Sequence, residues 1–173
     1  TKNKIYLDKF SKELCGKTRK NHFKGVLNVV NRFLEIIEPK YLLLGIKDLQ
    51  QLKLIELHIL KRKIKTKVIS CKTIREKNGI ACSTRNQNLD KKQVKLASKV
   101  FKYLKLKKNK IQKKLSSYEL TRIKKDLIKL GVTKIDYIKL LNLKNLKKPK
   151  TIKEKFKIFI AYYLKHVRLI DNI

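Results

Sequence analysis

The side chains in this sequence best suited to chemistry are basic ones, concentrated between residues 61 and 92. A dense run of cations comes first, and further lysines and arginines follow among small polar residues. Basic side chains in such a pattern neutralise phosphate groups. We therefore predict phosphate contacts from a set of candidate residues: Lys61, Arg62, Lys63, Lys65, Lys67, Lys72, Arg75, Lys77, Arg85, Lys91 and Lys92.

A turn inside this segment could bring the backbone close to a phosphate. Gly79, with Asn78 before it, permits a turn that presents backbone N–H groups, because glycine adopts backbone angles that other residues avoid. Lys72, Arg75, Lys77 and Arg85 surround this turn along the chain and supply the charge.

Other chemistry has little support in the sequence. Cys15, Cys71 and Cys82 lack the C-x₂-C spacing of a zinc site, and the histidines stand apart from them. Neither a glycine-rich phosphate loop, nor a nucleophile elbow, nor a distinct pair of carboxylates is present. We expect no enzyme activity, no catalytic residue, no metal and no cofactor.

Net charge narrows the class of partner. The chain has 47 Lys+Arg against 13 Asp+Glu, a formal net charge of +34, with 42% hydrophobic residues. Such a chain can fold, but its charge is relieved most directly by a polyanion, and its field argues against a free small-molecule enzyme. Only seven of the basic residues are Arg, so contacts to the nucleic-acid backbone are favoured over readout of bases. We therefore predict a ribosomal, rRNA-binding protein.

Apolar residues at spacings of three and four predict an all-α fold with a helical hairpin, a long basic loop at 61–90 and a C-terminal helical lobe. Phe33 lies on the apolar stripe of the first helix, so Phe33→Ala is expected to cost about 3–5 kcal/mol if that side chain is buried. The expected helices cover 20–38, 48–61, 90–104, 116–130, 133–141 and 152–170.

The domain organisation follows from these elements. We expect a helical rRNA-binding region over 1–104, a lysine-rich linker over 105–115 and a helical extension over 116–173. The chain lacks an apolar run of the roughly 18–20 residues needed to cross a membrane, so no membrane partner is expected.

One stretch resembles the signature of the bacterial-type small-subunit ribosomal protein S-thirteen family. Upstream, Gly45–Leu49 resembles the opening of that family's second helix, so the likeness covers about residues 20–92. Thr73, Glu76, Ala81 and Ser83 depart from the pattern. The matching residues are Ile69, Ser70, Cys71, Lys72, Ile74, Arg75, Gly79 and Ile80.

This resemblance implies a constituent of the small ribosomal subunit, with rRNA and neighbouring ribosomal proteins as partners and no small-molecule substrate. The abundance of Lys, Ile and Asn is typical of genes rich in A and T, as in many organelles, so we expect a mitochondrial or other organellar ribosome.

A second resemblance implies a different class of protein. Phe156–Asp171 is similar to the helix and arginine box of tyrosine recombinases, with Arg168 at the position of the catalytic arginine. Ser117–Leu120 is similar to the opening of their catalytic domain. The sequence ends at Ile173 without the later boxes, so this alternative predicts DNA binding without cleavage.

Overall fold

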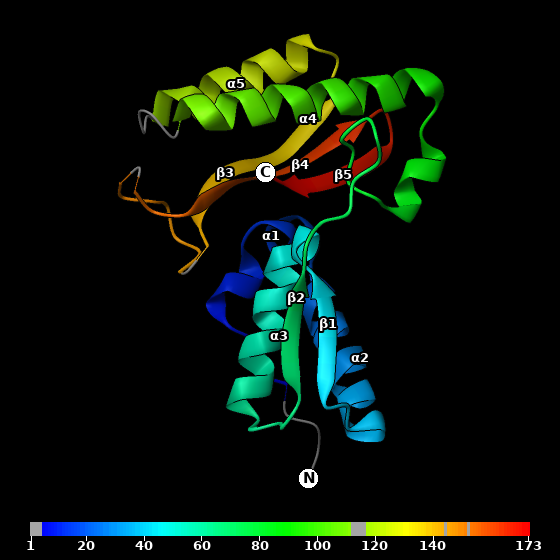
Figure 1. The fold of residues 1–173 in the computed structure, drawn as a ribbon, viewed down its shortest axis with the longest axis vertical. Helices are drawn as coiled ribbons and strands as arrows, with labels where there is room; N and C mark the ends of the chain where they lie inside the picture. Colours follow the sequence, from blue (N-terminus) through cyan, green and yellow to red (C-terminus); the bar gives the residue numbers. More distant parts are fainter. Residues whose placement is uncertain (1–4, 112–116, 144, 152) are drawn as a thin grey trace. The chain divides into compact units, whose positions relative to one another are not determined.

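The computed structural model describes residues 5–111, 117–143, 145–151 and 153–173. It contains two compact units, Thr1–Thr73 and Ile74–Ile173 (Figure 1). The all-α expectation is wrong, because the chain combines helices with one parallel and one antiparallel sheet.

The first unit is built around a strand–helix–strand element. Two short helical turns, η1 (Lys9–Lys12) and α1 (Cys15–Thr18), precede the longer helix α2 (His22–Ile37). Strand β1 (Tyr41–Gly45), the turn η2 (Ile46–Asp48), helix α3 (Leu49–Lys61) and strand β2 (Lys67–Cys71) follow. Strands β1 and β2 are parallel, with Tyr41 beside Lys67 and Gly45 beside Cys71.

Apolar side chains hold α2 and α3 against one face of this strand pair. Leu27 and Leu34 of α2 and Ile55 and Ile59 of α3 form the buried cluster. Leu42, Leu44 and Val68 of the strands pack against it. The helices predicted over 20–38 and 48–61 are thus confirmed, but the segment between them contains a strand, Tyr41–Gly45, that was not predicted from the sequence.

The other face of the strand pair is exposed in this unit. Leu43 is 63% exposed and Ile69 is 43% exposed, and among the described residues β1 pairs with β2 alone. Phe33 also lies outside the core, with 56% of its surface exposed, so the expected cost of Phe33→Ala does not hold. Parallel sheets are normally covered on both faces, and in this unit the face that holds Leu43 and Ile69 lacks that cover.

A buried histidine ties the start of the chain to both helices. His58 is fully buried, and its Nδ1 accepts the backbone N–H of Tyr6 at 3.2 Å. Its Nε2 therefore carries the proton and donates to Oδ1 of Asn31 at 2.9 Å. Asn31 in turn donates from Nδ2 to Glu35 at 2.8 Å. The neutral ring satisfies every partner, and a second proton would break the contact with Tyr6.

We expect the first unit to lose stability as the pH falls below about 6.5. Burial, with the nearby positive charge of Arg62, lowers the pKa of His58 below 6.5, and the opposing effect of Glu35 is smaller. Below 6.5 the unfolded chain binds a proton that the folded unit does not, so the slope approaches about 1.4 kcal/mol per pH unit. Urea unfolding between pH 5 and 8 measures it. The control variant His166→Gln, which replaces an exposed histidine, should show the same dependence of the unfolding free energy on pH as the wild type. If a His58→Gln variant showed this dependence in full, His58 would not be its cause.

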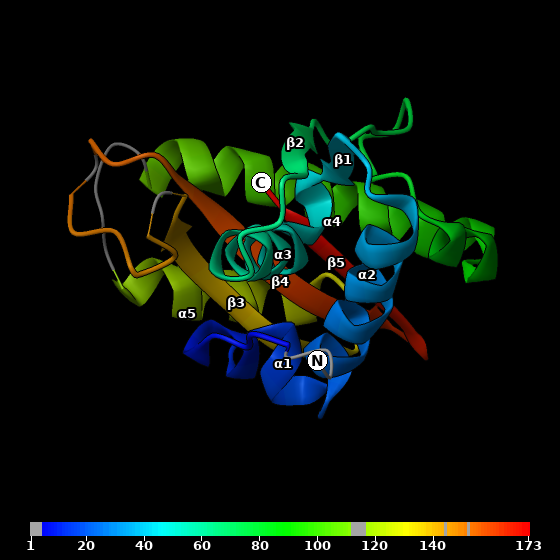
Figure 2. The same cartoon turned by 90° about the horizontal axis from the view of Figure 1, so that it is seen from below.

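The second unit is a three-stranded antiparallel sheet with two helices on one face (Figures 1 and 2). A short 3-10 turn, η3 (Thr84–Asn88), leads into α4 (Lys91–Ile111). Helix α5 (Ser117–Lys129) and strands β3 (Lys134–Asn142), β4 (Phe156–Leu164) and β5 (Val167–Asn172) follow in the order β3-β4-β5. Ile158, Ile160 and Leu164 of β4 are buried against Leu104 and Leu127 of the two helices.

Two expected helices in this unit are strands. The region expected to be helical over 133–141 is β3, and the region over 152–170 is mainly the hairpin of β4 and β5, turned at Lys165 and His166. The residues of β4 are almost all buried, so both of its faces are apolar and polar residues do not alternate along it. The chance spacing of Phe156, Phe159, Ile160 and Tyr163 imitated a helix.

The other two helices of this unit begin where the sequence predicted, but α4 extends beyond its expected end at residue 104. Helices α4 and α5 occupy the regions expected from 90 and from 116, and Asp90 begins α4 by accepting the N–H of Gln93 while Gln93 accepts that of Asp90. Of the predicted linker 105–115, residues 105–111 continue α4, and the remainder lies outside the described residues. The functional division into 1–104 and 116–173 stays a prediction.

Candidate functional site

The carboxyl ends of β1 and β2 form one edge of the first unit. Beyond β1 the chain turns through Ile46–Asp48 into α3, and beyond β2 it continues into Lys72. Lys47 and Asp48 lie at this turn, with Nζ 3.8 Å from Oδ2. Open α/β sheets bind ligands outside the carboxyl ends of their parallel strands. This edge is therefore the first candidate site.

A buried glutamine fixes the segment beside this edge. Gln50, in the first turn of α3, donates from Nε2 to the carbonyl oxygens of Phe10 at 2.8 Å and Glu13 at 2.7 Å. Its Oε1 accepts the N–H of Cys15 at 3.1 Å. Residues 10–15 are thus held to the start of α3, and the site is built on restrained backbone.

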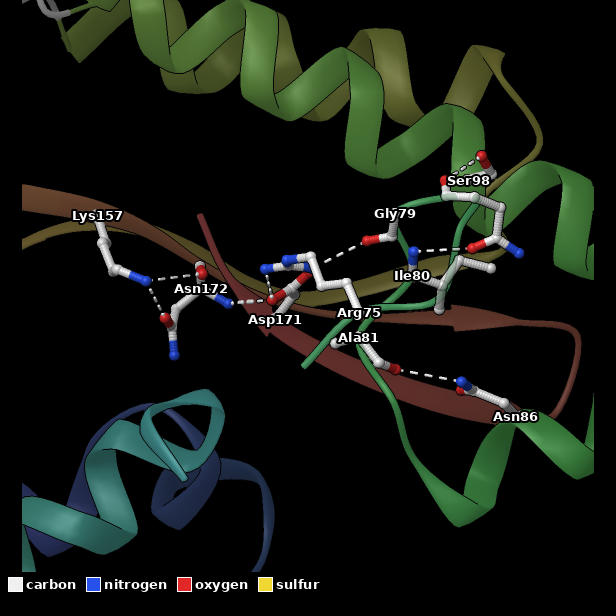
Figure 3. A network of polar contacts seen from close by, with 10 residues as sticks. Arg75, Gly79, Ile80, Ala81, Asn86, Ser98, Lys157, Asp171 and Asn172 are labelled. Carbon is white, nitrogen blue, oxygen red and sulfur yellow. Dashed lines mark hydrogen bonds and ion pairs between the residues drawn. The ribbon is translucent and has the colours of Figure 1, made fainter. Parts of the chain in front are cut away.

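The second candidate site is a turn at the start of the second unit (Figure 3). The backbone N–H of Glu76 donates to the carbonyl of Ile80 at 2.9 Å, and that of Cys82 donates to Ile74 at 3.0 Å. Gly79 closes the turn with a φ of +93°. The turn expected around Asn78 and Gly79 is present, and Gly79 serves it through its left-handed backbone.

Arg75 is engaged within this turn. Its guanidinium donates to both oxygens of Asp171 at 2.7 and 2.9 Å, and to the carbonyl of Gly79 at 3.1 Å. It also lies 4.3 Å from the centre of the Phe101 ring. Nearby, Lys157 donates to Asn172 at 2.7 Å, and burial lowers the pKa of Lys157.

Arg85 is placed differently. It lies in η3 directly after the turn, and its side chain is exposed. Its backbone N–H donates to Oγ of Ser83 at 3.3 Å, and the next residue, Asn86, donates to the carbonyl of Ala81 at 3.1 Å. A guanidinium on restrained backbone, with its head in solvent, is suited to bind an anionic group.

The predicted phosphate-binding residues do not form one surface. Ten of the eleven are exposed, and Arg75 is half-buried. In the first unit, Lys61, Arg62, Lys63, Lys65 and Lys67 lie at the amino end of β2, whereas Lys72 follows its carboxyl end. In the second unit, the turn region holds Arg75, Lys77 and Arg85, and the first turn of α4 holds Lys91 and Lys92. Phosphate contact by these residues stays a prediction.

Sequence reasoning missed the candidates Lys47 and Asp48. The signal was available, because Tyr41–Leu44 is a short apolar run between Pro39 and Gly45, followed directly by a helix. A strand followed by a helix places the connecting residues at the ligand-binding edge of an α/β sheet. Because Tyr41–Leu44 was not recognised as a strand, the site at the carboxyl edge of β1 and β2 was not identified from the sequence.

Metal-binding clusters and membrane-spanning helices are absent from the part of the chain that the structure describes. No group of three or more His, Cys, Asp or Glu side chains lies close enough there to hold a metal ion. No described helix is long and apolar enough to cross a membrane.

Comparison with known proteins relates the chain to one enzyme family. The family model described as Pantoate-beta-alanine ligase matches residues 2–173. The pantothenate synthetase of Ruthia magnifica subsp. Calyptogena magnifica is 38% identical over 170 residues, covering 97% of this chain and 61% of the relative. That of Clostridium botulinum (strain Langeland) is 35% identical over 176 residues, covering 98% and 63%. The chain thus spans about three fifths of the length of these curated relatives.

Solved structures of the same enzyme family also resemble this chain. Pantothenate synthetase from Thermus thermophilus matches with a TM-score of 0.87 at 24% identity, covering 98% of this chain and 62% of that one, which supports the fold alone. Pantoate-beta-alanine ligase from Francisella tularensis matches with a TM-score of 0.76 at 32% identity, covering 97% and 56%. The Francisella protein is described as complexed with Beta-gamma ATP and Beta-alanine.

These matches correct the functional expectations. The resemblances to the S-thirteen family and to tyrosine recombinases are not homology, so the ribosomal, translational and DNA-binding roles are wrong, as are the rRNA and ribosomal-protein partners. The mitochondrial or organellar ribosome is wrong as well, since the relatives are bacterial pantothenate synthetases. The expectations of no enzyme activity and no small-molecule substrate fail because the family consists of ligases and the Francisella member binds small molecules.

The prediction of an rRNA-binding protein was wrong because the high net charge was interpreted as evidence of a nucleic-acid partner. Lysines are spread over elements of both units, including α5, which contributes to neither candidate site, so the net charge of +34 does not point to one site. The match over residues 2–173 includes both candidate sites. The chain belongs to the pantoate-beta-alanine ligase family.

Proposed function

We propose that this chain takes part in an ATP-dependent ligase reaction that joins pantoate to β-alanine. The observation that carries the proposal is the family match over residues 2–173, supported by the Francisella relative described with Beta-gamma ATP and Beta-alanine. Because the chain spans about three fifths of its relatives' length, the proposed activity belongs to the complete family fold.

The chemistry explains why a nucleotide is needed. An amide forms when the amine of β-alanine attacks the carboxyl carbon of pantoate and one carboxylate oxygen leaves. That oxygen is a poor leaving group until it attacks a phosphorus of ATP, which breaks a P–O bond of the phosphate chain and releases the remaining part of ATP. The oxygen then leaves together with the attached phosphorus group when the amine attacks, and the amine loses a proton. A site for this reaction therefore needs cations that hold the phosphates and fix the reacting groups.

Arg85 is the candidate for phosphate binding in the second unit. Its side chain is exposed, and its backbone is held by Ser83 and, through Asn86, by the carbonyl of Ala81. Lys77 is also exposed and lies in the preceding turn. In the first unit, Lys47 and Lys72 supply positive charge at the carboxyl edge of β1 and β2, where a carboxylate or phosphate would bind.

The exposed face of the parallel strands also supports a larger fold. Leu43 and Ile69 are apolar and exposed, and among the described residues the outer edge of β1 is not paired. We place the part of the family fold that this chain does not match against this edge and face. The added strands and helices would give the sheet the cover that parallel sheets require.

Arg85→Ala should weaken ATP binding about 10- to 100-fold. A hydrogen bond to a charged group contributes about 1.5–3 kcal/mol, and about 1.4 kcal/mol corresponds to a factor of ten in affinity. Isothermal titration of the protein with ATP measures the change. The matched control is Arg122→Ala, which removes an exposed arginine from α5, a helix that contributes no residue to the turn. Equal affinities of the Arg85 and Arg122 variants would contradict the assignment of Arg85.

A further inference from the structure

We infer that Arg75 is a positioning residue that holds the nucleotide-binding segment Ser83–Asn88 to the sheet of the second unit. This inference rests on the proposed function of Arg85. It assigns Arg75 an indirect role, because its guanidinium is occupied by contacts within the protein (Figure 3).

The first step is the ion pair that anchors Arg75. Two guanidinium nitrogens meet two carboxylate oxygens of Asp171 on β5, at 2.7 and 2.9 Å. The side chains are 23% and 11% exposed, so water screens the pair only partly. Bidentate pairing fixes the plane of the guanidinium as well as its position. Asp171 is itself restrained, since its Oδ1 also accepts the N–H of Asn172 at 2.8 Å.

The second step is the turn that Arg75 holds. The same guanidinium donates to the carbonyl of Gly79 at 3.1 Å, and its Cζ lies over the ring of Phe101 on α4, 4.3 Å from the ring centre. A Cβ at Gly79 would lie 2.4 Å from that ring, so the turn rests directly on α4. Ser98, also on α4, donates to the carbonyl of Asn78 at 2.7 Å. The turn is thereby fastened to both the sheet and the helix.

The third step links the turn to Arg85. Asn86 donates from Nδ2 to the carbonyl of Ala81 at 3.1 Å and to Oε1 of Glu76 at 2.7 Å. Ala81 forms an isolated bridge with Arg75. The residue beside Arg85 is therefore bonded to the turn that Arg75 organises, and a loosened turn would loosen Arg85.

Replacement of Arg75 is expected to lower the affinity for ATP. Ordering a backbone segment costs conformational entropy, and a segment that becomes ordered only on binding lowers the affinity by that cost. Without Arg75, nucleotide binding would have to order the segment that the folded protein now presents already ordered. The affinity for ATP should fall and the KM for ATP should rise, while the second unit stays folded.

The test compares Arg75→Lys and Asp171→Asn with Arg168→Lys. Lysine keeps the charge but cannot pair bidentately. Arg168 is the matched control, because it also pairs with a buried carboxylate in the same sheet, but its partner at 2.7 Å is Asp136 on β3. Arg75→Lys and Asp171→Asn should each raise the Kd and KM for ATP about 5- to 20-fold with kcat changed less, and the double variant should be no worse than either single variant.

Two readouts separate the outcomes. Amide hydrogen exchange at Gly79 and Cys82 should become at least about tenfold faster in the Arg75 variant than in the Arg168 variant. If exchange there is unchanged, or if ATP affinity is unchanged while Arg85→Ala weakens it, the positioning role is overturned and the proposed function stands. If Arg85→Ala itself leaves ATP binding intact, the proposed function of Arg85 fails, and the role of Arg75 in binding fails with it. If Arg168→Lys lowers ATP affinity equally, the effect is general destabilisation, which also overturns the proposal.

Discussion

Ile160→Ala is expected to lower the free energy of unfolding by about 2–5 kcal/mol, the usual cost of truncating a fully buried isoleucine. Ile160 lies in the middle of β4 with none of its surface exposed, and belongs to the cluster that α4 and α5 cover. The small side chain would leave a cavity that the strand, paired on both sides, closes only in part. Urea unfolding followed by near-ultraviolet circular dichroism of the tyrosines measures the change.

Phe33→Ala is the matched control for this variant. Phe33 is larger than isoleucine, but it lies on the outer face of α2 and is 56% exposed, so its truncation should cost less than about 1 kcal/mol. An equal loss of stability in the two variants would contradict the position of the core. If Phe33→Ala lost more stability than Ile160→Ala, Phe33 would be buried, as the apolar stripe of the first helix predicted.

The long helices could be predicted because each shows a regular contrast between a buried and an exposed face. In α2, Phe23, Leu27 and Leu34 are buried, and lysine, asparagine and arginine lie between them. This contrast has the period of a helix and needs no knowledge of the rest of the fold. The exposed apolar residues of α2, such as Phe33 and Ile37, carry the same period and could not be told apart from the core.

The strands could not be read in the same way. Strands β1 and β2 have only five residues each, and β1 is apolar on both faces, so it lacks the alternation of polar and apolar residues that marks a half-buried strand. In β2, Lys67 lies on the same face as Ile69, and Ser70 on the same face as Val68, so its pattern does not separate a polar face from an apolar one. In β4, the nine residues Phe156–Leu164 hold a single lysine. The enrichment of this segment in aromatic and β-branched residues was the better signal, because these residue types favour strands.

The candidate site was only partly accessible from the sequence. Arg85, Lys77 and the turn at Gly79 were identified because glycine and cations were close together along the chain. The pairing of Arg75 with Asp171 joins residues 96 positions apart, and no spacing rule connects them. Because the chain contains so many lysines, charge alone could not show which basic residues belong to the site.

A buried ion pair in the sheet supplies the second large expected effect. Arg168 on β5 donates from Nε to Oδ2 of Asp136 on β3 at 2.7 Å, and the two side chains are 14% and 5% exposed. Asp136 lies at the irregularity in the register between Ile135 and Tyr137, which turns it toward the arginine. The arginine that resembled a recombinase catalytic residue therefore makes a structural contact in this fold.

Asp136→Ala should lower the free energy of unfolding by about 3–5 kcal/mol, because it leaves the charge of Arg168 in a largely buried position without its carboxylate. The double variant Asp136→Leu with Arg168→Met should lose less than Asp136→Ala alone, since apolar side chains of similar volume remove the desolvation cost of both charges. Urea unfolding of the wild type, the single variants Asp136→Leu and Arg168→Met, and their double variant gives the coupling energy between the positions. If the effects of the two single variants simply add in the double variant, the pair contributes no coupling, and the stability of the β3–β5 sheet would have to come from its apolar face alone.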